Sequence, residues 1–245
     1  MILAAVLTVM GAATALAQGI VVNKTDGSKV YFKASEVVSV TTYGYGEDGP
    51  HAPAGAEAVD LGLPSGTKWA CCNVDTDHPE KQSPTNYGGY YAWGETETKS
   101  NYSESAYQYY KSGSYQSIGS DIAGTKYDVA HVKWGGSWVM PSAEQQDELI
   151  FNCTNEWTSE NGVIGRKFTS KKNGKSIFLP AAGCINEDGI RYDGLSGSYW
   201  SSMPSQRPSY EDFFAYDLGF SWNWEFTGRG NVYRYYGFSV RPVSR

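Results

Sequence analysis

The chain has 245 residues, enough for one large domain or for one domain with a small appendage. Its formal net charge is -6, and no stretch of lysine and arginine could follow a phosphate backbone, which argues against nucleic acid as a partner. The 28 glycines, 19 tyrosines and 8 tryptophans favour short strands and many turns over a helical bundle. We therefore expect an all-β protein or an α+β protein dominated by strands.

The first 17 residues are apolar and uncharged, and they end in Ala15, Leu16 and Ala17, the small-x-small pattern that a signal peptidase accepts. A signal peptide over residues 1–17 predicts a secreted or cell-surface protein. No lysine or arginine precedes the apolar run, which is atypical of a signal peptide, and as a membrane span the run is marginally short. No later segment resembles a transmembrane helix.

Residues 18–43 are expected to form a small β module. Its two first strands flank Thr25–Ser28, where Asp-Gly is a turn signal, and a further β-branched run follows. Residues 44–55 are rich in glycine, proline and alanine, which is typical of a linker. The main domain is then predicted over residues 56–245.

Dense Gly, Pro and Asn punctuation predicts short strands throughout the main domain. The strongest helix signal begins at Ser142, which can cap the helix and form a capping box with Gln145, and Leu149 and Ile150 would lie on its buried side. A hairpin is predicted about Lys172–Gly174.

The C-terminal segment from residue 220 to residue 243 is unusually aromatic and predicts a hairpin with one buried and one displayed face. Its turn is expected at Gly228–Gly230. Period-two alternation predicts a buried set, namely Phe220, Trp222, Trp224, Phe226, Val232, Tyr236, Phe238 and Val240. The displayed set is Ser221, Asn223, Glu225, Thr227, Tyr233, Tyr235, Ser239 and Arg241.

The cysteines and histidines give little support for a metal site. No C-x-x-C spacing is present, and the three histidines are scattered singly. Cys71 and Cys72 are adjacent and could bridge each other only with strain. A disulfide would join one of them to Cys153 or Cys184, and buried free thiols are the alternative.

Several ordered blocks resemble one known family. "AVDLGLPSGTKWACCNV" (58–74), "GGYYAWGETETKS" (88–100), "DVAHVKWGGSWVMPSAEQQDELI" (128–150) and "YYGFSVRPV" (235–243), with "IFLPAAG" and "YWSS" between them, are similar to the Fibrobacter succinogenes major paralogous domain. The resemblance covers roughly residues 56 to 243. It implies an α+β, C-type-lectin-like fold of the formylglycine-generating-enzyme subclass, with small antiparallel sheets, one or two helices, long loops and chain ends close together.

The resemblance does not bring an enzyme with it. Formylglycine-generating enzymes hold copper through two cysteines in the C-terminal part, whereas this chain has no cysteine after Cys184. A nucleophile pairing of Cys153 with His131 lies in no motif that would orient a base. Trp69, Trp93, Trp134 and Trp138 stand in the family blocks near glycines and are expected in the core.

Calcium-dependent sugar binding is also disfavoured. C-type lectins that chelate calcium resemble one another in a Glu-Pro-Asn or Gln-Pro-Asp loop and a Trp-Asn-Asp strand, and the nearest string here is Trp222-Asn223-Trp224. No cofactor is predicted. Glu95 and the turn Glu187–Gly189 could at most help to hold a structural calcium ion, although solvated acidic turns are commoner.

The predicted function is therefore non-enzymatic binding of a glycan or a protein at a cell surface. Similar folds serve as variable receptors of diversity-generating retroelements, so a hypervariable receptor is one alternative, and a structural or adhesive surface subunit is another. Paratope-like surfaces favour Tyr, Ser and Asn. The predicted ligand-binding residues are Tyr210, Asp212, Asp217, Ser221, Asn223, Thr227, Asn231, Tyr233 and Tyr235.

Overall fold

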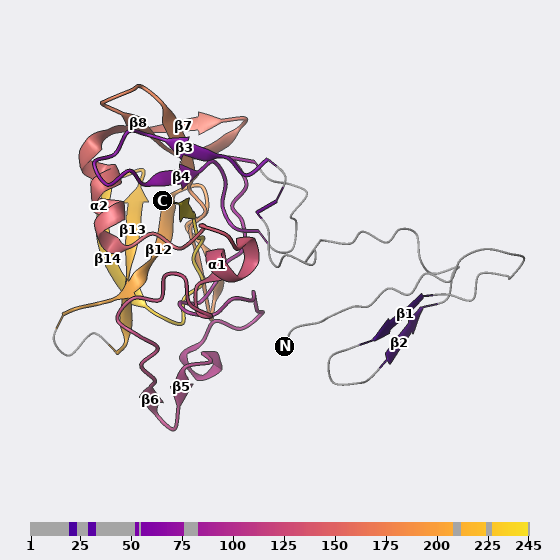
Figure 1. The fold of residues 1–245 in the computed structure, drawn as a ribbon. Coiled ribbons are helices and arrows are strands. Elements are labelled where there is room, and N and C mark those ends of the chain that lie inside the picture. Colours follow the sequence, from indigo (N-terminus) through magenta and orange to yellow (C-terminus); the bar gives the residue numbers. More distant parts are fainter. Residues whose placement is uncertain are drawn as a thin grey trace, which may run out of the picture. The chain divides into compact units, whose positions relative to one another are not determined.

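The computed structural model describes the backbone of residues 20–23 and 29–32 together with residues 52–53, 55–75, 83–207, 212–223 and 227–244 (Figure 1). The chain divides into two compact units, residues 1–44 and residues 45–245. The described residues form small antiparallel sheets with two α-helices, so the α+β class is confirmed. None of the helices in these residues is long and apolar enough to span a membrane.

In the smaller unit, strand β1 (Ile20–Asn23) pairs antiparallel with β2 (Lys29–Phe32), so the predicted hairpin is confirmed. The signal peptide predicted over residues 1–17 and the β-branched run after residue 33 lie outside the described residues. Most of the predicted linker, residues 44–55, also lies outside them.

The larger unit begins and ends in the same sheet. Strand β4 (Lys68–Ala70) is its centre, with β3 (Ala58–Asp60) on one side and β15 (Val243–Ser244) on the other. Because β15 lies near the end of the chain, this sheet holds the first and last strands of the unit on either side of β4.

The described residues of the larger unit form four further sheets. Two of them are two-stranded hairpins, β5 (Tyr110–Lys111) with β6 (Ser114–Tyr115) and β10 (Cys184–Asn186) with β11 (Gly189–Arg191). The other two are three-stranded, β7 (Cys153–Glu160), β8 (Val163–Ser170) and β9 (Ser176–Pro180), and β12 (Ser196–Pro204), β13 (Phe214–Ser221) and β14 (Thr227–Tyr233). The predicted hairpin about Lys172–Gly174 is the β8–β9 connection. In Figure 1, the sheet that contains β7 and the β5–β6 hairpin lie at opposite ends of this unit.

The predicted helix is α2 (Ala143–Asn152). Its capping box is present, since the Ser142 hydroxyl accepts a hydrogen bond from the Gln145 backbone N–H and the Ser142 N–H donates to the Gln145 side chain. Leu149 is fully buried, whereas Ile150 is half-buried. A second, six-residue helix, α1 (Val129–Trp134), was not predicted because it is too short to show helical periodicity; its main sequence signal is the Asp128 cap.

The core has two large clusters on either side of the β12–β14 sheet. Leu218 and Phe220 pack into the cluster that contains Leu149 of α2, while Trp200 and Ala215 pack into the other. Both faces of β13 are therefore covered. The four tryptophans predicted in the core behave as expected, with Trp138 half-buried against the core and the others buried.

The C-terminal prediction is wrong at several positions. Strand β14 runs through Gly228–Gly230, so the chain does not turn there, and the connection between β13 and β14 lies between Ser221 and Thr227 instead. Strand β13 ends at Ser221, so the alternation stops and the Trp222 side chain is 60% exposed. Ser239 and Arg241, which were expected on the displayed face, are fully buried, because both sides of this stretch are covered by protein. The predicted faces of three further residues are not tested, because Trp224, Glu225 and Phe226 lie outside the described residues.

Candidate functional site

The β13–β14 hairpin divides the predicted binding residues between its two ends. Phe214 is paired with Tyr233 at one end, and Phe220 is paired with Thr227 at the other. Six residue steps along a strand separate the two pairs, which corresponds to roughly 20 Å. The predicted residues therefore do not form a single cluster.

At the Tyr233 end, seven aromatic rings from three segments form a continuous series, which we call the aromatic row. Its members are Tyr110, Tyr115, Phe213, Phe214, Tyr233, Tyr235 and Tyr236. Successive ring centroids are 5.0, 5.1, 6.5, 4.4, 5.3 and 5.1 Å apart in that order. These distances lie in the range in which aromatic rings attract one another.

Two rings of the row are well exposed, Phe213 at 43% and Tyr233 at 39%. Tyr235 is half-buried and packs against the cluster of Tyr102 and Tyr107. The chain turns directly after β14, where the Tyr236 N–H donates to the Tyr233 carbonyl at 3.1 Å. This turn brings three tyrosines together within four residues and leaves part of their ring surface open to solvent.

The buried cation Arg234 contacts the backbone of the aromatic row. Arg234 is nearly fully buried, and its guanidinium lies 4.5 Å from the centroid of the Trp93 ring. Its Nε donates to the Phe214 carbonyl at 3.3 Å, and its backbone N–H donates to the Phe213 carbonyl at 3.0 Å. Burial lowers the pKa of Arg234. These contacts fix the backbone from which Tyr233 and Tyr235 project.

Three carboxylates act by their charge on residues at this end, namely Glu104, Glu187 and Asp212, and we call them the acidic rim. Glu104 accepts a hydrogen bond from the Tyr115 hydroxyl at 2.7 Å. Burial raises the pKa of Tyr235 to about 12, and the neighbouring tyrosines and the charges of Glu104 and Glu187 contribute to the same rise. Asp212 is exposed, and its charge acts on Arg234. The row therefore presents aromatic surface next to negative charge.

Asp217 was predicted as a ligand-binding residue, but its side chain is buried. It lies in the middle of β13 opposite Gly230, is 2% exposed, and its Oδ1 has no hydrogen-bond partner in the described residues. Burial raises the pKa of its carboxyl to about 7, although a hydrogen bond with Ser198 opposes the rise. Asp217 cannot contact a ligand at the surface.

The remaining predicted residues are placed separately from the row. Asn223 is exposed and accepts a hydrogen bond from the Ser221 hydroxyl at 3.1 Å. The Thr227 hydroxyl lies 3.4 Å from Asn155 Oδ1. Asn231 is half-buried in the middle of β14, and Tyr210 lies outside the described residues.

Sequence reasoning missed Phe213, Tyr110 and Tyr115 in the row. The signal for Phe213 was its neighbour Phe214, because two adjacent aromatic residues at the start of a strand cannot both point inward. No local signal indicated that the β5–β6 hairpin would reach the row, since that contact joins segments almost 100 residues apart.

A second group of exposed apolar side chains lies at the Ser221 end. Trp222, Leu195 and Tyr192 are 60%, 49% and 64% exposed. The Trp222 N–H donates to the Leu195 carbonyl at 3.0 Å, and the Leu195 N–H donates to the Tyr192 carbonyl at 2.9 Å, so the three backbones adjoin. The sequence analysis missed this group, because it placed Trp222 in the buried set.

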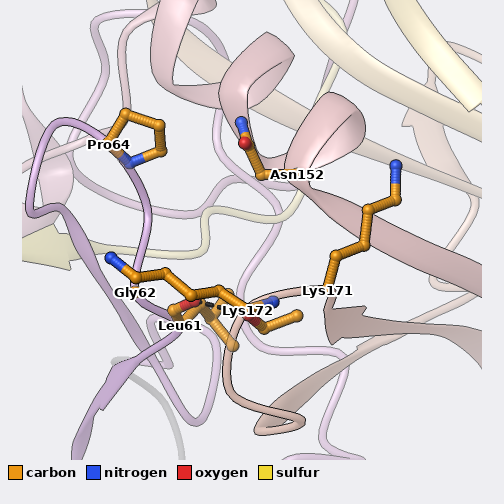
Figure 2. Close-up of a pocket in the computed structure, with 7 residues that line it drawn as sticks. Leu61, Gly62, Pro64, Asn152, Lys171 and Lys172 are labelled. Atoms are coloured by element: carbon orange, nitrogen blue, oxygen red, sulfur yellow. Dashed lines mark hydrogen bonds between the residues drawn. The ribbon is translucent and has the colours of Figure 1, made fainter.

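A cavity of about 420 Å³ lies elsewhere, between the end of α2, the β8–β9 turn and the loop after β3. Figure 2 shows Lys171 extending toward the end of α2 and Lys172 extending beside Leu61 and Gly62. Lys171 Nζ donates to the Phe151 carbonyl at 2.8 Å, and the Ser170 hydroxyl donates to the Leu61 carbonyl at 2.6 Å. The Lys171 ammonium and the Ser170 hydroxyl are thus hydrogen-bonded to backbone carbonyls of the fold. None of the predicted site residues lines the cavity.

Of the positions considered for metal or nucleophilic chemistry, Glu95 is engaged in contacts within the fold. Glu95 accepts hydrogen bonds from Lys99 at 2.9 Å and from the Gln108 N–H at 2.8 Å. Within the part of the chain that the structure describes, no group of three or more His, Cys, Asp or Glu residues is placed to hold a metal ion. Burial raises the pKa of the Cys153 thiol to about 11, which makes it a poor nucleophile.

Comparisons with protein-family models, with curated proteins and with solved structures gave no significant match to this chain.

Proposed function

We propose that the chain is a secreted or cell-surface binding protein without enzymatic activity, which recognises a glycan or protein ligand through its C-terminal strand-and-loop face. The observation that carries this proposal is the aromatic row at the Tyr233 end of the β13–β14 hairpin. Exposed rings held by buried contacts offer contact area at a small cost in conformational entropy.

We further propose that residues 56–243 form a C-type-lectin-like domain of the Fibrobacter succinogenes major paralogous type. Two helices, small antiparallel sheets and long connections support this proposal. The pairing of β3 and β15 with β4 supports it as well, because the family fold is expected to bring its chain ends together.

The row suits two kinds of contact. The ring faces of Phe213 and Tyr233 can stack on the apolar face of a sugar or on an apolar side chain, while tyrosine hydroxyls hydrogen-bond at the edge. The acidic rim favours ligands that carry positive charge. A protein ligand is therefore expected to place lysine or arginine side chains over the rings.

The test compares matched variants at the two ends of the hairpin. The natural chain is screened on a glycan array and on an array of cell-surface proteins, and the ligand found is titrated against Tyr233→Ala/Tyr235→Ala and against Asn223→Ala. We expect the double variant to weaken binding by about 100-fold, since two aromatic contacts at roughly 1.4 kcal/mol each are lost. Asn223→Ala should bind almost normally.

Equal binding by the double variant and the natural chain would remove the aromatic row as the site. Thermal unfolding of each variant serves as the control for folding, because both tyrosines also pack against their neighbours. A loss of binding by Asn223→Ala alone would move the site to the Ser221 end.

A structural or adhesive surface subunit is a second candidate, and the exposed side chains of Trp222, Leu195 and Tyr192 favour it. Adjoining exposed apolar groups often mark contacts between proteins. If the chain assembles through them, sedimentation of the natural chain will show oligomers that Trp222→Ser abolishes. A monomer at all concentrations would exclude this candidate.

The hypervariable receptor receives less support from the geometry. Varied positions must share one exposed surface, whereas Asp217 is buried and the other predicted positions divide between two ends of the hairpin. A reverse-transcriptase gene and a near-copy of the coding region for residues 199–243 in the neighbouring DNA would restore this alternative.

A further inference from the structure

The cavity beside the end of α2 lies against a basic stretch of an acidic chain. Between Asn161 and Asn186 the sequence has five cationic side chains and no acidic one, although the whole chain carries a formal net charge of -6. Two of the five, Lys171 and Lys172, line the cavity, whose volume is about 420 Å³. Ligand pockets of about 300–1,000 Å³ are usual in proteins. The local positive charge favours a ligand that carries a negative charge.

A buried hydroxyl fixes the backbone of Lys172. Ser170 is 4% exposed, and its Oγ accepts hydrogen bonds from the N–H groups of Lys172 and Asn173 at 3.1 and 3.3 Å. The same hydroxyl donates to the Leu61 carbonyl at 2.6 Å. The Asn173 amide donates to the Asp60 carbonyl at 2.9 Å. The β8–β9 turn is thus tied to the loop after β3, and the fold sets the position of Lys172 relative to that loop.

Gly62 gives the Lys172 side chain its path along the cavity. Gly62 has a φ of +65°, and a Cβ there would lie 3.0 Å from Lys172 Cδ, so a side chain at this position would press on the aliphatic part of the lysine. Figure 2 shows Lys172 extended beside Gly62, with Pro64 and Asn152 across from it. Within the described residues Lys172 Nζ forms no hydrogen bond or ion pair. Its ammonium can therefore pair with a ligand.

The side of the cavity across from Lys172 offers a hydrogen-bond acceptor and apolar surface. Asn152 Nδ2 donates to the Glu148 carbonyl at 2.8 Å, and because a carbonyl oxygen only accepts, Oδ1 is the amide atom left for a ligand. The exposed ring of Pro64 and the buried side chain of Leu61 add apolar surface. A simple inorganic anion would use only the charge of this site, whereas a sugar ring would use all three features.

Three further charged groups belong to the surroundings of the cavity. Lys171 Nζ donates to the Phe151 carbonyl, which uses one of the three donors of an ammonium group. Glu148 accepts hydrogen bonds from the Ser65 N–H and hydroxyl at 2.8 and 2.6 Å. Asp60 accepts one at 2.8 Å from a backbone N–H of the same loop. Both carboxylates thus have hydrogen-bond partners in the loop after β3, whereas within the described residues neither lysine of the cavity forms an ion pair.

We propose that this cavity binds an acidic sugar residue, that is, a sugar ring that carries a carboxylate. The Lys172 ammonium pairs with the carboxylate, Asn152 Oδ1 accepts a hydrogen bond from a ring hydroxyl, and the carbon–hydrogen face of the ring lies on Pro64. Uronic acids and sialic acids share this chemistry. No residue of the aromatic row lines the cavity, so this is a second site that goes beyond the proposed function.

The experiment titrates the isotope-labelled full chain with methyl glucuronide, with its uncharged carboxamide and with N-acetylneuraminic acid, and it follows binding by NMR. We expect at least one of the two acids to bind with a dissociation constant in the millimolar range. The carboxamide should bind about tenfold more weakly than methyl glucuronide, because it lacks the charge that pairs with Lys172. Raising sodium chloride from about 0.05 M to about 0.5 M should weaken binding of the acid, since salt screens exposed charges.

Matched variants test the role of Lys172. Lys172→Met keeps an aliphatic side chain and removes the charge, so it should weaken binding of the acid about tenfold, whereas Lys172→Arg should stay within about threefold of the natural chain. Lys175→Met is the control, because Lys175 lies in the same turn but does not line the cavity, and it should change binding less than about twofold. Both positions are exposed, so thermal unfolding of the variants should match that of the natural chain.

The variant Tyr233→Ala/Tyr235→Ala separates this site from the aromatic row. It should bind the acid as the natural chain does, so the failure of either proposal leaves the other standing. A loss of binding in this variant but not in Lys172→Met would place the acidic sugar on the row and overturn the cavity site.

Four other results would also overturn it. Neither acid would bind at up to about 50 mM, the acid and its carboxamide would bind equally, or Lys172→Met and Lys175→Met would lose binding to the same extent. The fourth is an affinity for acetate equal to that for the acidic sugar, because charge would then be the only feature recognised.

Discussion

The two ends of the β13–β14 hairpin carry exposed aromatic side chains with different support. At the Tyr233 end, rings from three segments contact one another above the buried Arg234. At the Ser221 end, Trp222 is more exposed than any ring of the row, and within the described residues it has no contact with another ring. The exposed fraction of an aromatic side chain therefore does not show whether neighbouring side chains hold it in a fixed position.

The largest effect on stability is expected when the buried side chain of Arg234, which contacts the backbone of the aromatic row, is removed. Arg234→Ala deletes a large buried side chain, its contact with Trp93 and its hydrogen bond with the Phe214 carbonyl. We expect it to lower the free energy of unfolding by about 3–4 kcal/mol, measured by urea denaturation.

Arg229→Ala, in β14, is the matched control for Arg234, which directly follows that strand. The Arg229 guanidinium also lies over a ring, that of Tyr216 at 5.0 Å, but its side chain is 28% exposed and its partners Glu144 and Asp147 are on the surface of α2. Solvent screens such contacts, so the expected loss is at most about 1 kcal/mol. Equal losses for the two variants would show that the row has no special support.

The second test concerns Asp217, which lies between the two ends. Its carboxyl has an ordinary pKa of 3.8 and a pKa of about 7 in the fold, so the folded chain binds a proton that the unfolded chain releases. Stability is then highest at low pH with respect to this group and falls as pH rises from about 4 to about 7. The shift of roughly three units corresponds to a loss of about 4 kcal/mol at most.

The variant Asp217→Asn has no carboxyl to ionise at this position, so it removes the loss of stability that accompanies the rise in pH. We expect the variant to be more stable than the natural chain at pH 8 by about 2 kcal/mol, because the buried amide still lacks part of its hydrogen bonding. At pH 4.5 the advantage should disappear. Urea denaturation at both pH values measures the change, and Asp212→Asn, at an exposed position, is the control. A constant difference at the two pH values would contradict the raised pKa.

Much of the local structure of this chain could be predicted from its sequence. The capping box of Ser142 and Gln145 fixes the start of α2, and Asn173-Gly174 fixes the β8–β9 turn. These signals depend only on residues a few positions apart. The same holds for the first hairpin, whose turn signal is Asp26-Gly27.

The C-terminal site could not be predicted in the same way, and Gly230 shows why. A Cβ at Gly230 would lie 2.3 Å from Asp217 Oδ1, so this glycine makes room for a carboxylate on the neighbouring strand and does not form a turn. Local sequence cannot distinguish these two uses of glycine. Period-two alternation cannot identify an exposed face on β13, because α2 and the second core cluster cover both faces of this strand.

The smallest expected changes in the free energy of unfolding come from removing one exposed ring at each end of the hairpin, and they compare the two ends directly. Tyr233→Ala removes a half-exposed ring that contacts Phe214, Tyr235 and Tyr236, and it should lower the free energy of unfolding by about 1 kcal/mol. Trp222→Ala removes a larger ring but should change it by no more than about 0.5 kcal/mol, because an exposed side chain loses little packing. Urea denaturation of the two variants side by side decides the matter. If Trp222→Ala proved the more costly substitution, the Ser221 end would be the supported one, and the search for the ligand would begin there.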